Sequence, residues 1–292
     1  MKALDLPTTR TKVKPFLKWA GGKGRLLAQY APYLPRTFGT YHEPFCGGGA
    51  VFFHLVPAQA VLSDINPELV NVYACVRDEV AAVCARLSEH AALHSQMHYY
   101  ATRALKPLDL TAVERAARFI YLNRTCYNGL YRENAGGGFN VPMGRYVRPT
   151  ICDTPTLLVA SAALAGSTIT QAPFEAVLAR AVAGDLVYFD PPYQPLSATS
   201  NFTSYSRHGF GEDAQVRLRD LFVELTRRGV RALLSNSDCA FTRDLYRDFR
   251  CVTITAGRAI NTRAERRGKI TELLVLNWDA EMAPAGDMRD AS

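Results

Sequence analysis

The residues of this chain with the clearest chemical potential form one short run, Asp190-Pro191-Pro192-Tyr193, after an apolar stretch that begins at Val187. A residue before proline is restricted to extended geometry, and proline has no N–H, so this corner presents hydrogen-bond acceptors. A substrate amino group can give one hydrogen to the Asp190 carboxylate and the other to the Pro191 carbonyl, while Tyr193 stacks on the attached ring. The run predicts a site for the exocyclic amine of a nucleobase. A structural proline turn after a strand is the alternative.

A glycine-rich turn, Cys46-Gly47-Gly48-Gly49, is a second candidate site. Glycine lets the backbone approach a ligand closely, and Asp64 ends the next apolar run, where a carboxylate can hold ribose hydroxyls. The spacing differs from the G-x-G-x-x-G of dinucleotide sites, so a nucleoside-type ligand is favoured over a dinucleotide. A tight turn with an acidic helix cap is the alternative.

Residues 18–24 match a phosphate-binding loop only in part, because Gly24 stands where a serine or threonine should follow Lys23. Nucleotide hydrolysis is therefore not expected. Lys23, beside two glycines, can instead bind a carboxylate, and Trp19 can lie against a flat or cationic group. A solvated lysine and a core tryptophan are the alternatives.

Basic and aromatic residues concentrate in two further segments. Residues 123–132 combine two arginines and two tyrosines with an Asn-Gly turn. Arginine pairs bidentately with guanine in the major groove, and an apolar residue at a hairpin tip can fill the gap that a flipped base leaves. Residues 258–269 carry four arginines and one lysine against one glutamate, which suits a flap that contacts phosphates. A surface hairpin and a solvated loop are the alternatives.

Three histidines, His90, His94 and His98, recur at four-residue spacing and raise the question of a metal site. Eight residues of one helix rise about 12 Å, which is too far for three imidazoles to reach one ion. We therefore expect no metal site here and place the histidines at the surface or half-buried.

Composition sets the class of protein. The 292 residues, 48% of them hydrophobic, suffice for a large α/β domain with an insertion, and a net charge of +7 favours an anionic partner such as nucleic acid. Seven cysteines without a C-x-x-C pair indicate a reducing compartment. No run approaches the roughly 18 apolar residues of a membrane helix, and the N-terminus lacks a signal-peptide core. We expect a cytoplasmic protein without membrane contact.

The pattern of apolar runs predicts how these motifs are positioned. A strand, a glycine turn, a helix at 50–55, a second strand and an acid make half of a doubly wound nucleotide-binding fold. Residues 67–155 change character, with helical periodicity to about residue 121 and then a segment rich in Gly, Asn, Tyr and Arg. We predict an α/β fold with a catalytic domain (1–66 and 156–292) and an inserted, mainly helical domain (67–155) that carries a β-hairpin. Strands are expected at 40–45, 60–63, 168–172, 186–190, 232–235, 251–255 and 273–278, the last two antiparallel.

Taken together, these motifs make the sequence similar to the Dam-type DNA adenine-N6 methyltransferases, and especially to the GATC modification methylases of the Dpn type. The resemblance covers nearly the whole chain, and its order, with cofactor segments first, the recognition insert next and Asp-Pro-Pro-Tyr afterwards, is that of the alpha group. The segments that carry it are 15–23, 43–49, 64–66, 127–130, 139–142, 190–193 and 202–205.

The resemblance implies a Rossmann-like class I methyltransferase sheet, mostly parallel with an antiparallel last strand, and S-adenosyl-L-methionine as cofactor. Relatives often have Asp or Ser where this chain has Pro173, so we expect no cofactor contact there, whereas Phe174 should pack beside the cofactor adenine. Asn236 should face the site from a strand end, with a structural cap as the alternative. The implied cofactor residues are Trp19, Lys23, Phe45, Gly47, Gly49, Asp64, Ile65, Phe174 and Asp190. The implied DNA contacts are Lys18, Arg124, Tyr127, Asn128, Leu130, Arg132 and Arg145.

The expected function is methyl transfer to N6 of adenine in double-stranded DNA, with GATC as the expected target and with the target base flipped out and held by Asp190, Pro191, Pro192 and Tyr193. An RNA adenine-N6 methyltransferase and a catalytically idle DNA-binding protein of the same fold are the alternatives. A monomer without an obligatory protein partner is expected.

Overall fold

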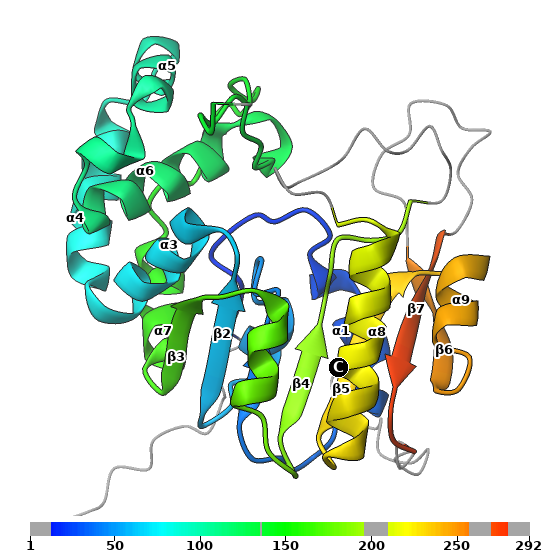
Figure 1. Cartoon of the computed structure of the whole chain (residues 1–292). Coiled ribbons are helices and arrows are strands. Elements are labelled where there is room, and N and C mark those ends of the chain that lie inside the picture. Colours follow the sequence, from blue (N-terminus) through cyan, green and yellow to red (C-terminus); the bar gives the residue numbers. More distant parts are fainter. Residues whose placement is uncertain (1–12, 135, 196–209, 257–269, 280–292) are drawn as a thin grey trace, which may run out of the picture.

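The structure is a computed structural model that describes residues 13–134, 136–195, 210–256 and 270–279 (Figure 1). Within these residues, seven strands form one sheet in the order β3-β2-β1-β4-β5-β7-β6. Every neighbouring pair is parallel except those of β7, which runs antiparallel to both β5 and β6. The predicted α/β fold class is confirmed. The strands are β1 (Tyr41–Glu43), β2 (Ala60–Asp64), β3 (Ser167–Gln171), β4 (Leu186–Phe189), β5 (Arg231–Ser237), β6 (Arg250–Ala256) and β7 (Ile270–Leu276).

Helices cover both faces of the sheet, because the central strands are apolar on both sides. In β4, Leu186 and Tyr188 point into one buried cluster, while Val187 and Phe189 point into another. The first cluster includes side chains of α1, α2, α3 and α6, and α8 covers the second (Figure 1). The helices are α1 (Leu27–Tyr30), α2 (Ala50–Leu55), α3 (Pro67–Asp78), α4 (Val80–Ala92), α5 (Gln96–Ala104), α6 (Ala112–Thr125), α7 (Thr154–Leu164), α8 (Glu212–Arg227) and α9 (Ala240–Leu245).

The predicted insertion begins with α3, whose first turn is capped by the Asn66 side chain. Helices α4, α5 and α6 lie to one side, beyond α3 (Figure 1). Helix α3 contacts β2 and β3 as well as α6, so it joins the insertion to the sheet. The helical periodicity predicted to about residue 121 is confirmed, and it continues to Thr125. The division into two domains at residues 67 and 155 stays a prediction.

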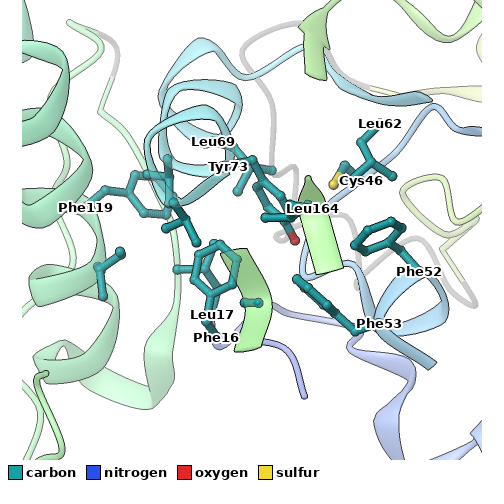
Figure 2. Packing of buried hydrophobic residues seen from close by; sticks show 14 of the residues in the cluster. Phe16, Leu17, Cys46, Phe52, Phe53, Leu62, Leu69, Tyr73, Phe119 and Leu164 are labelled. Carbon is teal, nitrogen blue, oxygen red and sulfur yellow. The ribbon is translucent and has the colours of Figure 1, made fainter. Parts of the chain in front are cut away.

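The core is continuous from the sheet to the insertion (Figure 2). Phe16 lies with its ring centroid 6.0 Å from that of Phe53 and 5.1 Å from that of Tyr73. Phe119 on α6 belongs to the same cluster. The N-terminal segment around Phe16 is therefore packed between the sheet layer and the helices of the insertion.

His90, His94 and His98 were expected on a single helix, and this expectation was wrong, because residues 90–98 do not form one helix. Helix α4 ends at Ala92, and Ser95 caps a new helix by accepting from the His98 N–H. The bend brings His90 Nδ1 to 2.9 Å from His98 Nε2, and His94 Nδ1 to 2.9 Å from the Tyr121 hydroxyl. Among the described residues, no group of three or more ligating side chains is arranged to hold a metal ion.

The predicted hairpin is irregular. After α6 the chain turns through Asn128 and Gly129, both with positive φ, and then doubles back. Isolated antiparallel bridges, Cys126 with Met143 and Glu133 with Phe139, hold it in place of a regular ladder. The glycines at 136–138 and Pro142 explain the irregularity, since glycine weakens a strand and proline removes a donor.

None of the helices in the described residues is long and apolar enough to span a membrane.

Candidate active site

The candidate site lies where the sheet changes direction. The chain moves from β1 to β2 and β3 on one side and places β4 and β5 on the other, so β1 and β4 flank the switch point. Ligands of open parallel sheets bind at the carboxyl ends of strands at such a point. Asp64 ends β2, and Asp190 follows β4 directly. Both predicted acids therefore lie along the same edge of the sheet.

The glycine turn after β1 is held by the acid at the end of β2. Asp64 Oδ2 accepts from the Gly47 N–H at 3.2 Å, and Asp64 Oδ1 accepts from the Asn66 N–H at 3.0 Å. Burial raises the pKa of Asp64, and these backbone donors oppose that rise. Gly47 and Gly49 have φ of +48° and +63°, which a side chain rarely tolerates. A Cβ at Gly47 would lie 2.9 Å from the Trp19 ring.

Aromatic and apolar side chains border this turn. Trp19 covers the glycines and stacks on Tyr131 at 5.7 Å between centroids. Phe45 and Phe174 stack on each other at 5.5 Å, with their planes 23° apart. Ile65, directly after Asp64, is 55% exposed. An apolar surface beside a carboxylate and a glycine turn is suited to a flat, ribose-bearing ligand.

Lys23 and Asp190 form a buried ion pair. Lys23 Nζ lies 2.8 Å from Asp190 Oδ1, and it also donates to the Gly21 carbonyl at 2.6 Å. The Lys23 side chain is 3% exposed, whereas that of Asp190 is 23% exposed. Nζ also lies 4.7 Å from the centroid of the Tyr193 ring, within the range of a cation–π contact. This intramolecular pair was not predicted from the sequence, and the role of Lys23 in cofactor binding stays a prediction.

The proline corner is anchored from β5, β7 and α8. Gln215 Nε2 donates to the Pro192 carbonyl at 3.0 Å, and the Tyr193 hydroxyl donates to Glu272 Oε2 at 2.7 Å. Asn236 is fully buried, and its Oδ1 accepts from the Gln194 N–H at 3.1 Å. Asn236 thus caps the segment after the corner, which is the structural alternative that the sequence left open.

A second carboxyl is buried under the site. Glu43, at the end of β1, is 2% exposed, and the Tyr41 hydroxyl donates to its Oε2 at 2.9 Å. The pKa of Glu43 is raised to about 8, mainly by burial and in part by the charge of Asp190, while the Tyr41 hydrogen bond and Lys23 oppose the rise. Sequence reasoning missed this residue as a titrating group.

The segment that carries Trp19 is fixed to the insertion by hydrogen bonds from side chains of α6 to its backbone. Asn123 Oδ1 accepts from the Lys18 N–H at 2.8 Å, and Asn123 Nδ2 donates to the Lys18 carbonyl at 2.6 Å. Arg124 Nη2 donates to the Phe16 carbonyl at 2.8 Å, and burial lowers the pKa of its guanidinium. Lys18 Nζ lies 4.1 Å from the centroid of the Tyr146 ring.

The predicted DNA contacts divide into two groups by their surroundings. Lys18, Arg124 and Leu130 are half-buried and pack within the protein. The other predicted contacts are exposed: Tyr127, Asn128, Arg132 and Arg145. Among these, Arg132 has a partner within the protein, since its Nε donates to Asn140 Oδ1 at 2.7 Å. The basic segment 258–269 and residues 202–205 lie outside the described residues.

Comparison with known proteins agrees with this arrangement. The family model of the D12 class N6 adenine-specific DNA methyltransferases matches residues 19–260. The chain belongs to this family. The methyltransferase is 42% identical over 279 residues to the Type II methyltransferase M1.LlaDCHI of Lactococcus lactis, covering 94% of this chain and 98% of the relative. It is 41% identical to the Type II methyltransferase M.MjaIII of Methanocaldococcus jannaschii (91% and 100% covered) and 36% identical to a DNA adenine methylase of Vibrio cholerae (91% and 96%).

Methyltransferases of the D12 class take their methyl group from S-adenosylmethionine. The site fits that molecule, because the Asp64 carboxylate keeps lone pairs beyond those that accept from backbone N–H groups. Ribose hydroxyls are natural partners for those lone pairs.

The structure brings the predicted cofactor residues together along one edge of the methyltransferase sheet. Three buried residues that the sequence analysis did not single out lie next to them, and each stands out in the sequence. Asn123 interrupts an apolar helix face, and Ser235 follows two leucines in the strand beside Asp190. Glu43 is a lone acid in a buried strand.

Proposed function

We propose that this methyltransferase flips an adenine out of double-stranded DNA and methylates its N6 at the Asp190 corner, with GATC as the target sequence. The observation that supports it best is the partly exposed Asp190 carboxylate at the carboxyl end of β4, beside the switch point of the sheet and paired with Lys23, which lies over the Tyr193 ring. A stacked adenine inside a duplex cannot reach a carboxylate that ends a sheet strand, so extrusion of the base is required.

Asp190 and the Pro191 carbonyl are the proposed acceptors for the two N6 hydrogens. Gln215 already occupies the Pro192 carbonyl, which leaves the Pro191 carbonyl as the acceptor that the corner presents to a substrate. Lys23 lies over one face of the Tyr193 ring, and Glu272 holds the hydroxyl, so the adenine would stack on the opposite face.

The chemistry is a direct displacement. When bound, S-adenosylmethionine supplies a methyl group on a positively charged sulfur that leaves as a neutral thioether. The N6–carbon bond forms as the carbon–sulfur bond breaks, and N6 loses one proton, which Asp190 accepts and passes to solvent. The N6 lone pair is delocalised into the ring, so accepting its hydrogens localises electron density as the bond forms. Alignment and fixed charges supply most of the acceleration.

We assign target recognition to the exposed tip of the insertion. Asn140 binds Arg132 through Nε, and the terminal nitrogens of the guanidinium have no partner among the described residues. They can therefore pair with the two acceptors of guanine in the major groove. Tyr127 is 52% exposed at the turn and can enter the gap that the flipped base leaves. Lys18, Arg124, Leu130 and Arg145 are proposed to complete this surface.

Two of the relatives are named Type II methyltransferases, which supports a modification role beside a restriction nuclease. We further infer a cytoplasmic monomer without an obligatory protein partner.

The deciding experiment is transfer of labelled methyl from S-adenosylmethionine to matched duplexes with GATC, with a scrambled site, and with GATC already methylated at N6 on both strands. Label only in unmethylated GATC supports the proposal. Label in other DNA would keep the chemistry and change the target, and label in none of the duplexes would refute the proposal. Asp190→Ala should abolish transfer while DNA binding remains measurable, and near-normal turnover in that variant would refute the role of Asp190.

A further inference from the structure

Ser235 lies beside Asp190 because of the register between β4 and β5. The two strands are parallel, and their last registered pair is Phe189 with Leu234. Asp190 and Ser235 are the next residues of each strand, so they lie side by side at the carboxyl edge. Ser235 is fully buried, whereas Asp190 is partly open to solvent.

A directed chain of hydroxyls ends on the carboxylate. Ser235 Oγ lies 2.9 Å from Asp190 Oδ1 and 2.9 Å from the Tyr188 hydroxyl, with a longer contact of 3.4 Å to the Phe189 carbonyl. A serine has one hydrogen, and the charged oxygen is the stronger acceptor. The order is therefore Tyr188 to Ser235 to Asp190. Burial raises the pKa of Tyr188, so this hydroxyl keeps the hydrogen that it donates.

Lys23 and Ser235 engage the same oxygen. Lys23 Nζ lies 2.8 Å from Asp190 Oδ1, the atom that Ser235 also contacts. Two donors on Oδ1 fix the rotation of the carboxylate and satisfy that oxygen. Within the described residues no donor engages Oδ2, so that oxygen can accept an incoming N–H. The two oxygens of Asp190 are thereby made unequal by the surrounding protein.

We propose that Ser235 is a positioning residue that, with Tyr188 behind it, holds Asp190 by Oδ1 so that Oδ2 accepts the hydrogen of the substrate amino group. The inference rests on the proposed function, because it assigns the geometry by which Asp190 acts. The effect of Ser235 passes through Asp190, so its loss should appear in the chemical step and not in binding.

The test compares Ser235→Ala, Tyr188→Phe and the double variant in single-turnover and steady-state methyl transfer. Loss of one hydrogen bond to a carboxylate should lower kcat of Ser235→Ala by about 10- to 100-fold, with KM for DNA and cofactor within about twofold of wild type. Tyr188→Phe should show a smaller fall. In the double variant, Tyr188→Phe should add nothing, because the serine through which it acts is absent.

Matched controls are Ser167→Ala and Tyr246→Phe, which remove buried hydroxyls at the opposite end of β3 and in the α8 core and should leave kcat unchanged. Thermal unfolding of each variant checks the fold, and if Ser235→Ala does not fold, Tyr188→Phe carries the test alone through its kcat.

Three results would overturn the inference: an unchanged kcat in Ser235→Ala, a rise in KM in place of a fall in kcat, or losses that add in the double variant. Asp190→Ala, measured alongside, separates the two proposals. If Asp190→Ala is inactive and Ser235→Ala is normal, the positioning role fails alone. If Asp190→Ala is active, the proposed function itself fails.

Discussion

Replacement of Glu43 by glutamine should change how the stability of this protein depends on pH. Glu43 is 2% exposed, and burial raises the pKa of its carboxyl to about 8 in the folded protein. Glutamine has nearly the same shape and can still accept from the Tyr41 hydroxyl, but it cannot ionise. The pair of proteins therefore isolates the titration of a single group.

The sign and size follow from linkage. The ordinary pKa of this carboxyl is 4.5, so between pH 4.5 and about 8 the folded protein holds a proton that the unfolded chain has lost. The free energy of unfolding therefore falls as the pH rises through this window. At about 1.4 kcal/mol for each factor of ten in proton affinity, the whole window is worth about 5 kcal/mol, and about 3 kcal/mol of it is lost by about pH 7.

Urea unfolding of both proteins at a series of pH values measures this effect. From about pH 5 to about pH 9, the free energy of unfolding of wild type should fall by about 4 kcal/mol relative to that of Glu43→Gln. A constant difference between wild type and Glu43→Gln across this range would show that Glu43 titrates alike in the folded and unfolded states, and would refute the reasoning.

Three further changes test other parts of the structure. Arg132→Ala should lower discrimination between bases by about 1 to 3 kcal/mol in duplex binding, with nearly unchanged salt dependence, whereas equal loss on every sequence would make it a phosphate contact. Gly47→Ala places a methyl group 2.9 Å from the Trp19 ring at a φ of +48°. The affinity for S-adenosylmethionine, measured by calorimetry, should therefore weaken about tenfold or more. An affinity equal to that of wild type would contradict the assignment of the glycine turn to the cofactor. Asn123→Leu leaves the Lys18 N–H and carbonyl without their partner. The free energy of unfolding in urea should therefore fall by about 2 to 4 kcal/mol. No measurable fall would mean that these two hydrogen bonds do not stabilise the fold.

The strands could be predicted from the sequence because their signal is local. The runs at Ala60 and Leu186 are apolar and end at acids or turns, and each became a strand within a residue or two of the expected bounds. The antiparallel pairing of the last two strands was also confirmed. In contrast, the histidine pair depended on a helix break at Ser95, and one serine at a cap is too weak a signal to override four-residue spacing.

Single residues of the candidate site could be predicted from the sequence, but the contacts between them could not. Asp190, Lys23 and Gly47 were singled out by their neighbours in the chain, but the contact between Lys23 and Asp190 joins residues far apart in sequence. Ser235 could not be placed without the strand register, and the half-buried state of Arg124 follows from a carbonyl on the distant Phe16. Sequence patterns report periodicity and motif, whereas such pairings are set by tertiary packing.

The hydrogen bonds of the Asn123 side chain matter for engineering variants with new target sequences. The amide binds the backbone of Lys18 and the Gly129 carbonyl, so the attachment of the hairpin does not depend on the side chains at its tip. A transplanted loop between α6 and residue 145 would stay attached only if Asn123 is kept and Tyr131 still stacks on Trp19. Position 129 must also stay glycine, because a Cβ there would lie 2.6 Å from the Lys18 side chain. If this loop has the proposed role in target recognition, we expect that loops from other methyltransferases of this class can replace it without changes to the residues around Asp190.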